Sequence, residues 1–471
     1  MSQSTTGIRC ERHDFDPGVL REYDIRGVYG ETLSERDAYA VGRSFATRLR
    51  RTGGRLVAVG YDGRLSSSSL ETALILGLTD GGVDVRRVGL GPTPLLYYAV
   101  ASGQGVDGGI QVTGSHNPKD HNGFKIVLGG QPFFGDDIFD LARLAAAGDW
   151  SVGRGIVDDV DLGDAYLDRI VQALDGIDPG VFDTWRIGWD TGNGAAGPLV
   201  QRLVRRLPGR HHVFFAEVDG HFPNHHPDPT VPANLADLIA AVMAGNIDFG
   251  FAFDGDGDRL GLVDSRGRIV WGDQILLILA EDLLRRVPGA RIMADVKTSQ
   301  VVFDRIAALG GEPVLWKTGH SLIKSGMKQK GAILAGEMTG HLFFADTFEG
   351  YDDALYAALR VMAACARLGR TPTELRDAMP ETFATPELRL TVPGTDPATA
   401  MTAVLSALRN EGAVFDAIDG ARVRHADGWW LLRPSNTQAM LSARAESTSA
   451  AGLERVLADL DCHLAAAGVS R

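Results

Sequence analysis

Cysteine is scarce in this chain. Only 3 of its 471 residues are cysteines, and they lie far apart, at Cys10, Cys365 and Cys462. An odd and scattered set of this kind predicts neither a disulfide framework nor a Cys-x-x-Cys metal pair. Because stable disulfides belong to oxidising compartments, the scarcity of cysteine indicates a reducing, cytoplasmic location.

Long apolar runs and an excess of positive charge are missing too. Runs such as residues 275–280 are far shorter than the roughly 20 apolar residues of a membrane-spanning helix. Residues 1–12 lack the apolar core of a signal peptide. The net charge of −13 argues against nucleic acid and anionic membranes as partners. A small anionic substrate is still compatible, because a pocket in an acidic protein can be locally positive.

Glycine, by contrast, is abundant. The 58 glycines exceed the usual share of about 7%, which predicts many tight turns. At about 100–200 residues per domain, a chain of 471 residues is expected to form three or four domains.

One pattern of strand, loop and helix occurs three times. Apolar runs that lead into Asp-containing loops lie at residues 56–59, 187–189 and 292–294. A second apolar run follows each, at residues 83–88, 213–218 and 314–316. Each unit then reaches a third strand with a distinctive loop, at residues 113–118, 254–259 and 336–341. The pattern predicts three similar α/β units with mixed, mainly parallel sheets, whose ligand loops gather at the strand carboxyl ends.

The sequence changes character after residue 380. Strands are expected at residues 387–392, 428–432 and 441–446, and helices at residues 402–410 and 452–466, which indicates a smaller α+β domain. The predicted domain boundaries are 1–160, 161–267, 268–380 and 381–471, with a hinge near residues 379–386.

Ser115 lies in the loop Thr-Gly-Ser-His-Asn-Pro at residues 113–118. Gly114 and Pro118 break regular structure, so Ser115 is expected on a tight turn at a strand end. A hydroxyl there suits a nucleophile or a phosphate carrier, whereas the alternative is a serine that caps a helix. The Gly-x-Ser-x-Gly elbow of many hydrolases is not met, because Asn117 occupies its last position.

Three carboxylates, Asp254, Asp256 and Asp258, alternate with glycines after the apolar residues 249–253. This spacing can wrap oxygen atoms around one hard cation. The later Glu of an EF-hand loop is missing, so Mg²⁺ shared with a phosphate is the better interpretation, and a solvated acidic turn is the alternative. Such an ion could neutralise a phosphoryl group next to Ser115.

Two further polar loops suit a phosphorylated sugar. Glu337, Thr339 and His341 stand at alternate positions, so on an extended loop they face one side and could bind neighbouring sugar hydroxyls. The second loop offers a guanidinium, two hydroxyls and an amide, which suit a phosphate dianion or, alternatively, a capped turn. Its residues are Arg433, Ser435, Asn436 and Thr437.

Together these four motifs, in this order, resemble those of the α-D-phosphohexomutases, and most closely the bacterial phosphomannomutase/phosphoglucomutase branch. The resemblance covers nearly the whole chain and implies four domains in a heart-shaped arrangement around one cleft. It implies that Ser115 is carried as a phosphoserine, and that Mg²⁺ is bound by Ser115, through its phosphoryl group, with Asp254, Asp256 and Asp258. Thr339 stands where the family usually has Ser, and Pro434 where it usually has Ala.

The resemblance also implies roles for single residues. The implied catalytic set is Ser115, His116, Lys125, Arg259 and His320, with the general acid or base open between Lys125 and His320. The implied substrate-binding set is Tyr23, Arg26, Lys297, Glu337, Thr339, His341, Arg433, Ser435, Asn436 and Thr437.

The implied activity is that of an isomerase, an intramolecular phosphotransferase. It interconverts hexose 1-phosphate and hexose 6-phosphate, of mannose or glucose, through a bound 1,6-bisphosphosugar. A hexose 1,6-bisphosphate is the implied activator that phosphorylates the enzyme, and a monomer is expected, with a dimer as the alternative.

Three different functions compete with this one. Phosphoglucosamine mutase is disfavoured by Met338, a residue typical of the mannose and glucose branch. A metal-dependent sugar phosphatase would share the acidic loop but release free phosphate. A non-catalytic phosphosugar sensor would keep Arg433 but would not need Ser115 and the three aspartates, so their presence argues against a sensor.

Overall fold

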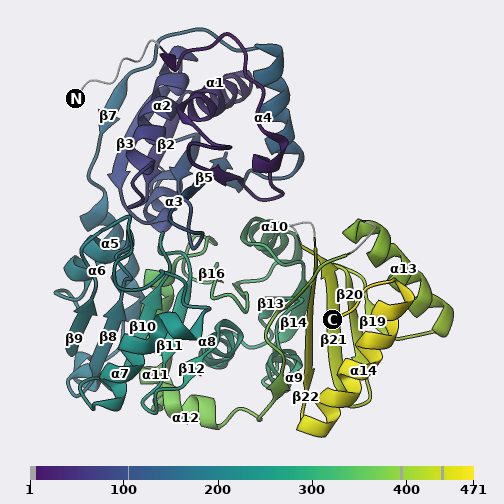
Figure 1. Ribbon diagram of the computed structural model, residues 1–471. Helices are drawn as coiled ribbons and strands as arrows, with labels where there is room; N and C mark the ends of the chain where they lie inside the picture. Colours follow the sequence, from purple (N-terminus) through teal and green to yellow (C-terminus); the bar gives the residue numbers. More distant parts are fainter. Residues whose placement is uncertain (1–6, 104, 393–395, 436–439) are drawn as a thin grey trace.

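Four β-sheets divide the chain into four successive units (Figure 1). The computed structural model describes residues 7–103, 105–392, 396–435 and 440–471. The strand orders are β1-β5-β4-β2-β3-β7 with β6 beside β5, then β12-β11-β10-β8-β9, then β14-β13-β15-β16, and finally β17-β22-β21-β20-β19 with β18 beside β22. Within the described residues, no helix combines the length and apolar character needed to cross a membrane.

The first two units hold the following elements. Strands of the first are β1 (Ile25–Val28), β2 (Leu56–Tyr61), β3 (Asp84–Leu90), β4 (Gly108–Val112), β5 (His121–Leu128), β6 (Gln131–Pro132) and β7 (Val157–Asp159), and its helices are α1 (Glu35–Arg51), α2 (Ser67–Asp80), α3 (Thr93–Ala101) and α4 (Asp136–Ala147). The second has β8 (Arg186–Asp190), β9 (Arg210–Phe214), β10 (Phe249–Phe253), β11 (Leu260–Val263) and β12 (Ile269–Val270), with α5 (Gly163–Val171), α6 (Gly197–Leu203) and α7 (Ala236–Met243).

The last two units complete the fold. The third has β13 (Arg291–Asp295), β14 (Glu312–Trp316), β15 (Leu334–Gly336) and β16 (Leu342–Phe344), with α8 (Gly272–Arg286), α9 (Gln300–Ala308), α10 (His320–Lys330), α11 (Ala354–Leu368) and α12 (Pro372–Asp377). The fourth has β17 (Phe383–Ala384), β18 (Leu388–Leu390), β19 (Phe415–Asp416), β20 (Ala421–His425), β21 (Gly428–Pro434) and β22 (Leu441–Ser447), with α13 (Pro397–Glu411) and α14 (Ala450–Ala466). Short 3-10 helices are η2 (Pro17–Val19), η3 (Gln172–Leu174), η4 (Pro179–Phe182) and η5 (Pro232–Leu235).

The first three units repeat one topology, which confirms the predicted α/β repetition. In each, a first strand pairs in parallel with the second strand on one side and with the third strand on the other. A fourth strand then pairs antiparallel with the third. The sheets are therefore mixed, with parallel pairs in the middle and antiparallel pairs toward one edge. The fourth unit is an antiparallel sheet with two helices, as an α+β domain requires.

Some element boundaries differ from those expected. The sequence of residues 31–50 favours a helix over that whole range, but the helix begins at Glu35, because Ser34 and Asp37 form a capping box. The strand predicted at residues 213–218 ends at Phe214, because Phe215 has a φ of +51°, which no extended strand accommodates.

The apolar core ties the first three units together more tightly than the fourth. One large cluster of buried residues includes Tyr97 of α3, Trp189 of β8 and Tyr356 of α11. The fourth unit has its own cluster. Among the described residues, a small cluster of Val296, Trp429 and Leu431 joins it to the third unit. Because burial of apolar surface is the main force that holds such units together, the fourth unit should be displaced most easily.

Candidate functional site

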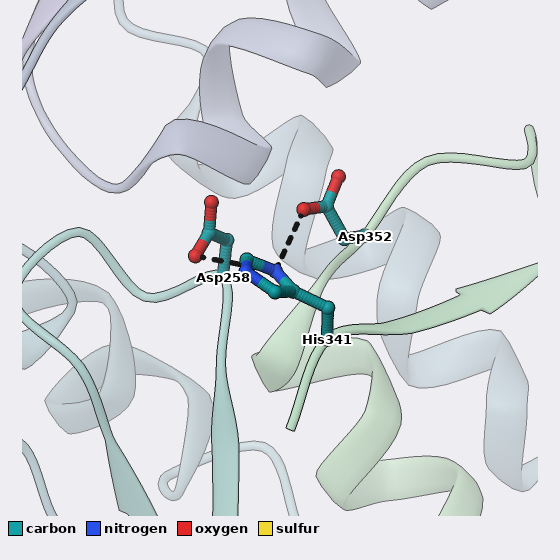
Figure 2. A group of neighbouring side chains, drawn as sticks. All are labelled: Asp258, His341 and Asp352. Atoms are coloured by element: carbon teal, nitrogen blue, oxygen red, sulfur yellow. Dashed lines mark ion pairs between the residues drawn. The ribbon is translucent and has the colours of Figure 1, made fainter. Parts of the chain in front are cut away.

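Three equivalent loops of the repeated units meet at one place. They lie between the third and fourth strands of each sheet, after β4, β10 and β15. The Ser115 hydroxyl donates to Asp254 Oδ2 at 2.8 Å, and Arg259 Nε donates to His341 Nε2 at 3.0 Å. His341 also faces Asp258, with Nδ1 3.6 Å from Oδ1 (Figure 2). The repetition of the fold therefore brings together three loops found in the sequence: the serine loop (residues 113–118), the acidic loop (residues 254–259) and the sugar loop (residues 336–341).

Ser115 is held in a strained and buried turn. Its φ is +49°, a left-handed conformation that non-glycine residues adopt at a cost and that is concentrated at functional sites. The neighbouring acidic loop approaches closely, so that a Cβ on Gly255 would lie 2.6 Å from the Ser115 carbonyl oxygen. The turn thus fixes the hydroxyl against the acidic loop.

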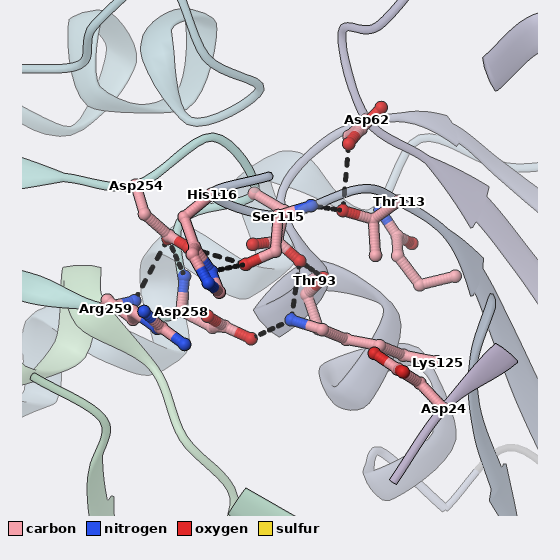
Figure 3. A network of polar contacts seen from close by, with 12 residues as sticks. Asp24, Asp62, Thr93, Thr113, Ser115, His116, Lys125, Asp254, Asp258 and Arg259 are labelled. Atoms are coloured by element: carbon pink, nitrogen blue, oxygen red, sulfur yellow. Dashed lines mark hydrogen bonds and ion pairs between the residues drawn. The ribbon is translucent and has the colours of Figure 1, made fainter. Parts of the chain in front are cut away.

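Two buried residues that the sequence motifs did not assign to the site, Asp62 and Arg64, hold this turn. Asp62 Oδ2 accepts hydrogen bonds from Thr113 Oγ1 at 2.8 Å and from the Gly114 N–H at 3.1 Å (Figure 3). Arg64 Nη2 donates to the carbonyl oxygens of Ser115 and Asn117, both at 2.6 Å. Both residues follow β2, the neighbour of β4, so the Asp-led loop after that strand was the signal in the sequence.

His116 lies directly beside the serine hydroxyl. Its Nδ1 is 3.1 Å from Ser115 Oγ. Burial lowers the pKa of His116 well below its ordinary value, and the positive charges of Arg259 and Arg26 lower it further. The ring is therefore neutral near pH 7 and can exchange a proton with the serine oxygen.

The three aspartates of the acidic loop are fully buried, and some of their oxygen atoms accept hydrogen bonds from protein donors. Asp254 Oδ1 accepts the backbone N–H groups of Asp258 at 3.0 Å and of Arg259 at 3.1 Å. Asp256 Oδ2 accepts from Thr93 Oγ1 at 2.6 Å and from Lys125 Nζ at 2.7 Å. Lys125 Nζ also contacts Asp258 Oδ2 (Figure 3).

The remaining oxygen atoms of this loop fit a hard cation. Asp256 Oδ1 and Asp258 Oδ1 are buried and have no hydrogen-bond partner among the described residues. One oxygen of each of the three aspartates lies within 4.8 Å of the others. Burial and the two neighbouring carboxylates raise the pKa of Asp254 well above its ordinary value, a repulsion that a divalent cation would relieve. An all-oxygen donor set of this kind suits Mg²⁺.

The sugar loop presents two of its predicted residues together. Thr339 Oγ1 donates to Glu337 Oε2 at 3.2 Å, and Glu337 Oε1 accepts the Gly319 N–H at 3.2 Å. His341, at the end of the loop, stacks on His320 with ring centroids 5.6 Å apart. Burial lowers the pKa of His320 well below its ordinary value, as does the nearby charge of Lys324.

Two more predicted cationic residues, Lys297 and Arg433, lie with Tyr23 on the Glu337 side of the sugar loop. Lys297 Nζ donates to Glu387 Oε1 at 2.6 Å, and Arg433 Nε lies 3.0 Å from Asp419 Oδ2. The Tyr23 hydroxyl donates to the Thr318 carbonyl oxygen at 2.9 Å. Lys297, Arg433 and Tyr23 come from three different units, so this end of the site is assembled across domains.

Four predicted substrate-binding residues remain: Arg26, Ser435, Asn436 and Thr437. Arg26 of β1 pairs with Asp24, near the serine end of the site. The Ser435 N–H donates to the Met440 carbonyl oxygen at 2.8 Å. Asn436 and Thr437 lie outside the described residues.

Comparison with known proteins agrees with this geometry. Four family models match, described as phosphoglucomutase/phosphomannomutase alpha/beta/alpha domains I, II and III and the C-terminal domain, over residues 18–150, 164–267, 271–383 and 387–462. The chain therefore belongs to the α-D-phosphohexomutase family, in its phosphoglucomutase/phosphomannomutase group.

Individual relatives match over almost their whole length. A phosphomannomutase/phosphoglucomutase of Pseudomonas aeruginosa is 42% identical over 443 residues, 93% of each chain. A phosphoglucomutase of Neisseria gonorrhoeae is 41% identical over 442 residues, 93% of this chain and 95% of its own. The crystal structure of a phosphoglucomutase/phosphomannomutase family protein from Burkholderia thailandensis is 42% identical, covers 96% of this chain and 98% of its own, and superposes with a TM-score of 0.90. The fold and family define an isomerase that acts on hexose phosphates.

Proposed function

We propose that this enzyme interconverts the 1-phosphate and 6-phosphate of mannose, glucose or both, with Ser115 as the residue that carries the phosphoryl group. The observation that carries the proposal is the hydroxyl of Ser115, held in a strained turn 2.8 Å from the carboxylate of Asp254. A hydroxyl fixed beside a cluster of carboxylates that suits Mg²⁺ is the arrangement that phosphoryl transfer needs.

The acidic loop would hold the metal through Asp254, Asp256 and Asp258, together with a phosphoryl oxygen on Ser115. When bound, Mg²⁺ would neutralise negative charge on the phosphoryl group being transferred. Burial acts to lower the pKa of Lys125, but Asp256 and Asp258 raise it above its ordinary value. Lys125 therefore stays a cation and balances charge next to the same group.

In each transfer, the phosphoryl group moves from one oxygen atom to another. The bond from phosphorus to Ser115 Oγ breaks as the bond to sugar O1 forms, which gives a bound 1,6-bisphosphosugar. The sugar hydroxyl gives up its proton to a base, and Ser115 Oγ takes up one proton in exchange. Neutral His116, whose Nδ1 lies 3.1 Å from Ser115 Oγ, would pass this proton on by accepting one at Nε2 as it donates from Nδ1. For the base we favour His320 over Lys125. The lowered pKa of His320 leaves its ring unprotonated and able to accept a proton near pH 7, whereas Lys125 stays a cation, and the buried Nδ1 of His320 has no hydrogen-bond partner among the described residues.

The proposed site has two ends, which would allow one enzyme to transfer a phosphoryl group to or from either O1 or O6 of the sugar. Ser115 and the acidic loop form one end, and Lys297 with Arg433 forms the other, where it would bind the phosphate that is not transferred. Glu337 and Thr339 lie between them and would bind the sugar hydroxyls. A bisphosphosugar that turns end for end keeps its middle near this loop, and the second phosphate then returns to Ser115.

The organisation of the whole protein completes the proposal. The domain boundaries 1–160, 161–267, 268–380 and 381–471 are supported by the four family-model ranges, which fall within them apart from residues 381–383. The scarce cysteines support a cytoplasmic location, and the enzyme is proposed to be a monomer that a hexose 1,6-bisphosphate activates.

One assay distinguishes a mutase from a phosphatase and a sensor. The protein is incubated with mannose 1-phosphate, Mg²⁺ and a trace of glucose 1,6-bisphosphate, and 6-phosphosugar and inorganic phosphate are both followed. A mutase yields the 6-phosphosugar, a phosphatase yields inorganic phosphate, and a sensor yields neither. Turnover on mannose, glucose and glucosamine phosphates then identifies the preferred sugar.

A further inference from the structure

The serine loop takes one backbone hydrogen bond from a histidine of the second unit. The carbonyl oxygen of His116 accepts from His226 Nε2 at 2.6 Å. His226 lies in the segment of residues 215–231, which connects β9 to η5. Because a carbonyl oxygen can only accept, His226 Nε2 must carry a hydrogen. The side chain therefore bridges two units at the residue directly after Ser115.

This bond adds to those that Arg64 makes from the first unit. Arg64 Nη2 donates to the carbonyl oxygens of Ser115 and Asn117, one on each side of the carbonyl that His226 holds. Side chains of two units thus hold three consecutive carbonyl oxygens of the serine loop. A peptide group that is held at its oxygen cannot rotate freely about its neighbouring bonds. The bond from His226 therefore restricts the backbone of His116, whose Nδ1 lies 3.1 Å from Ser115 Oγ.

A strained aromatic residue lies against both donors. The Arg64 guanidinium lies over the ring of Phe222, 5.5 Å from its centroid, and the His226 ring meets the Phe222 ring edge-on at 6.3 Å. Phe222 has a φ of +51°, a left-handed conformation that a bulky side chain rarely adopts. Such strain persists only where the surrounding structure enforces it, and it is concentrated at functional sites.

The segment that carries His226 is anchored to the Asp-led loop after β8. Asn193 Oδ1 in that loop accepts from Asn224 Nδ2 at 2.8 Å, and Asp190 Oδ1 lies 3.0 Å from His225 Nε2. Two residues next to His226 in the chain are therefore fixed to the sheet of the second unit. The equivalent loop of the first unit, after β2, contacts the serine turn directly, whereas this loop reaches it through the segment.

The second unit also carries the acidic loop, which follows β10. A bond from His226 to the serine loop therefore fixes the position of Ser115 relative to Asp254, the carboxylate that its hydroxyl contacts at 2.8 Å. Where a phosphoryl carrier and its charge-stabilising groups come from different units, their relative position decides the rate of transfer. A misplacement of about 1 Å can cost about 100-fold in rate.

We infer that His226 is a positioning residue, which holds the His116 carbonyl oxygen and so fixes the serine loop against the acidic loop. The effect on catalysis rests on the proposed function of the site, whereas the hydrogen bond itself does not.

The first test compares three variants in the Mg²⁺-loaded enzyme. His226→Phe keeps a ring but removes the donor, and His226→Gln keeps a donor, because an amide nitrogen can take the place of Nε2. His221→Phe, at an exposed position of the same segment, is the matched control. We expect His226→Phe to lose about 10–100-fold in kcat with KM within about threefold, and the other two to stay within about threefold of the wild type.

The outcomes of this test separate the inference from the proposed function. If the wild type turns over and His226→Phe matches His221→Phe, the positioning role is wrong and the proposed function stands. The role is also wrong if His226→Gln loses as much kcat as His226→Phe, since the donor then does not matter. A wild type without mutase activity would overturn the proposed function instead.

The second test observes the hydrogen bond without any assay of activity. Nitrogen-15 spectra of the imidazole side chains of the wild type, assigned by comparison with His226→Gln, show which ring nitrogen carries hydrogen. We expect an Nε2–H on His226 that exchanges with water much more slowly than the ring hydrogen of the exposed His221. A His226 ring with its hydrogen on Nδ1 alone, or one that exchanges as fast as His221, would overturn the inference even if His226→Phe fails to fold.

Discussion

At the scale of single residues, the site depends on side chains that are buried while still polar or charged. Ser115, Lys125 and the three aspartates of the acidic loop are each at most 3% exposed. Burying such groups is costly unless each is paired or bonded, so their clustering marks a place selected for chemistry rather than stability. Ser115 and Asp256 can each be tested by a single substitution.

Replacement of Ser115 by Ala removes the oxygen that would carry the phosphoryl group. We expect kcat to fall at least about 1,000-fold, while calorimetry shows glucose 1-phosphate bound within about threefold of the wild-type affinity. Ser68→Ala, at an exposed position of α2, serves as the control and should keep full turnover. Near-normal turnover of Ser115→Ala would show that another residue carries the phosphoryl group.

Replacement of Asp256 by Asn removes one charged ligand of the proposed metal site. Calorimetric titration with Mg²⁺ is expected to show affinity at least about 10-fold weaker than in the wild type. Asp248→Asn, at the residue just before β10 and at the opposite end of that strand from Asp256, should bind Mg²⁺ normally, since the Asp248 side chain accepts a hydrogen bond from Arg186. Equal Mg²⁺ binding by Asp256→Asn and the wild type would place the metal elsewhere.

At the scale of elements, much of the site follows from the position of each loop in a repeated sheet. The motifs around Ser115, Asp254 and Glu337 could be predicted because glycines and alternating polar residues mark them in the sequence. The residues that hold these loops in place could not be predicted in this way. Arg64 is an ordinary polar residue in the sequence, and its role arises only where loops from distant positions touch.

Helix α11 and α5 meet at a carboxyl group whose ionisation should affect stability. Burial raises the pKa of Asp353 to about 7, above its ordinary value near 3.8, where its oxygens accept from the Tyr166 hydroxyl. The folded protein therefore binds this proton more tightly than the unfolded chain, so the contribution of Asp353 to stability decreases as pH rises from about 4 to 7.

Thermal unfolding of the wild type and of Asp353→Asn at several pH values measures this contribution. The melting temperature of the wild type should decrease relative to that of Asp353→Asn between about pH 5 and pH 7.5, because Asn does not ionise. A difference that stays constant over this range would contradict a raised pKa at Asp353.

At the scale of the whole molecule, the fourth unit is held to the third mainly by polar contacts. Glu446 Oε1 on β22 accepts hydrogen bonds from Ser299 Oγ at 2.8 Å, from the Gln300 N–H at 3.1 Å and from Trp429 Nε1 at 2.9 Å. Ser299 and Gln300 begin α9 of the third unit, so one carboxylate joins the two units. The four-unit arrangement was predictable from the family resemblance, whereas this junction was not, because nothing in the local sequence marks Glu446.

Removal of this junction should loosen the fourth unit. In Glu446→Ala we expect faster amide hydrogen exchange at the start of α9 and along β22, and a KM for phosphosugar raised several-fold, because Arg433 belongs to the displaced unit. Glu446→Gln keeps an acceptor oxygen and should behave nearly like the wild type. Unchanged exchange in Glu446→Ala would show that the apolar contacts alone hold the two units.

The central claim is that Ser115 both gives and takes back a phosphoryl group. Enzyme labelled at Ser115 with radioactive phosphate is mixed with unlabelled mannose 6-phosphate in a single turnover, and the label is followed on protein, sugar and inorganic phosphate. We expect the label to leave Ser115 for a bisphosphosugar and then to appear in sugar monophosphate. Label that remains on the protein, or that is released mainly as inorganic phosphate, would contradict it.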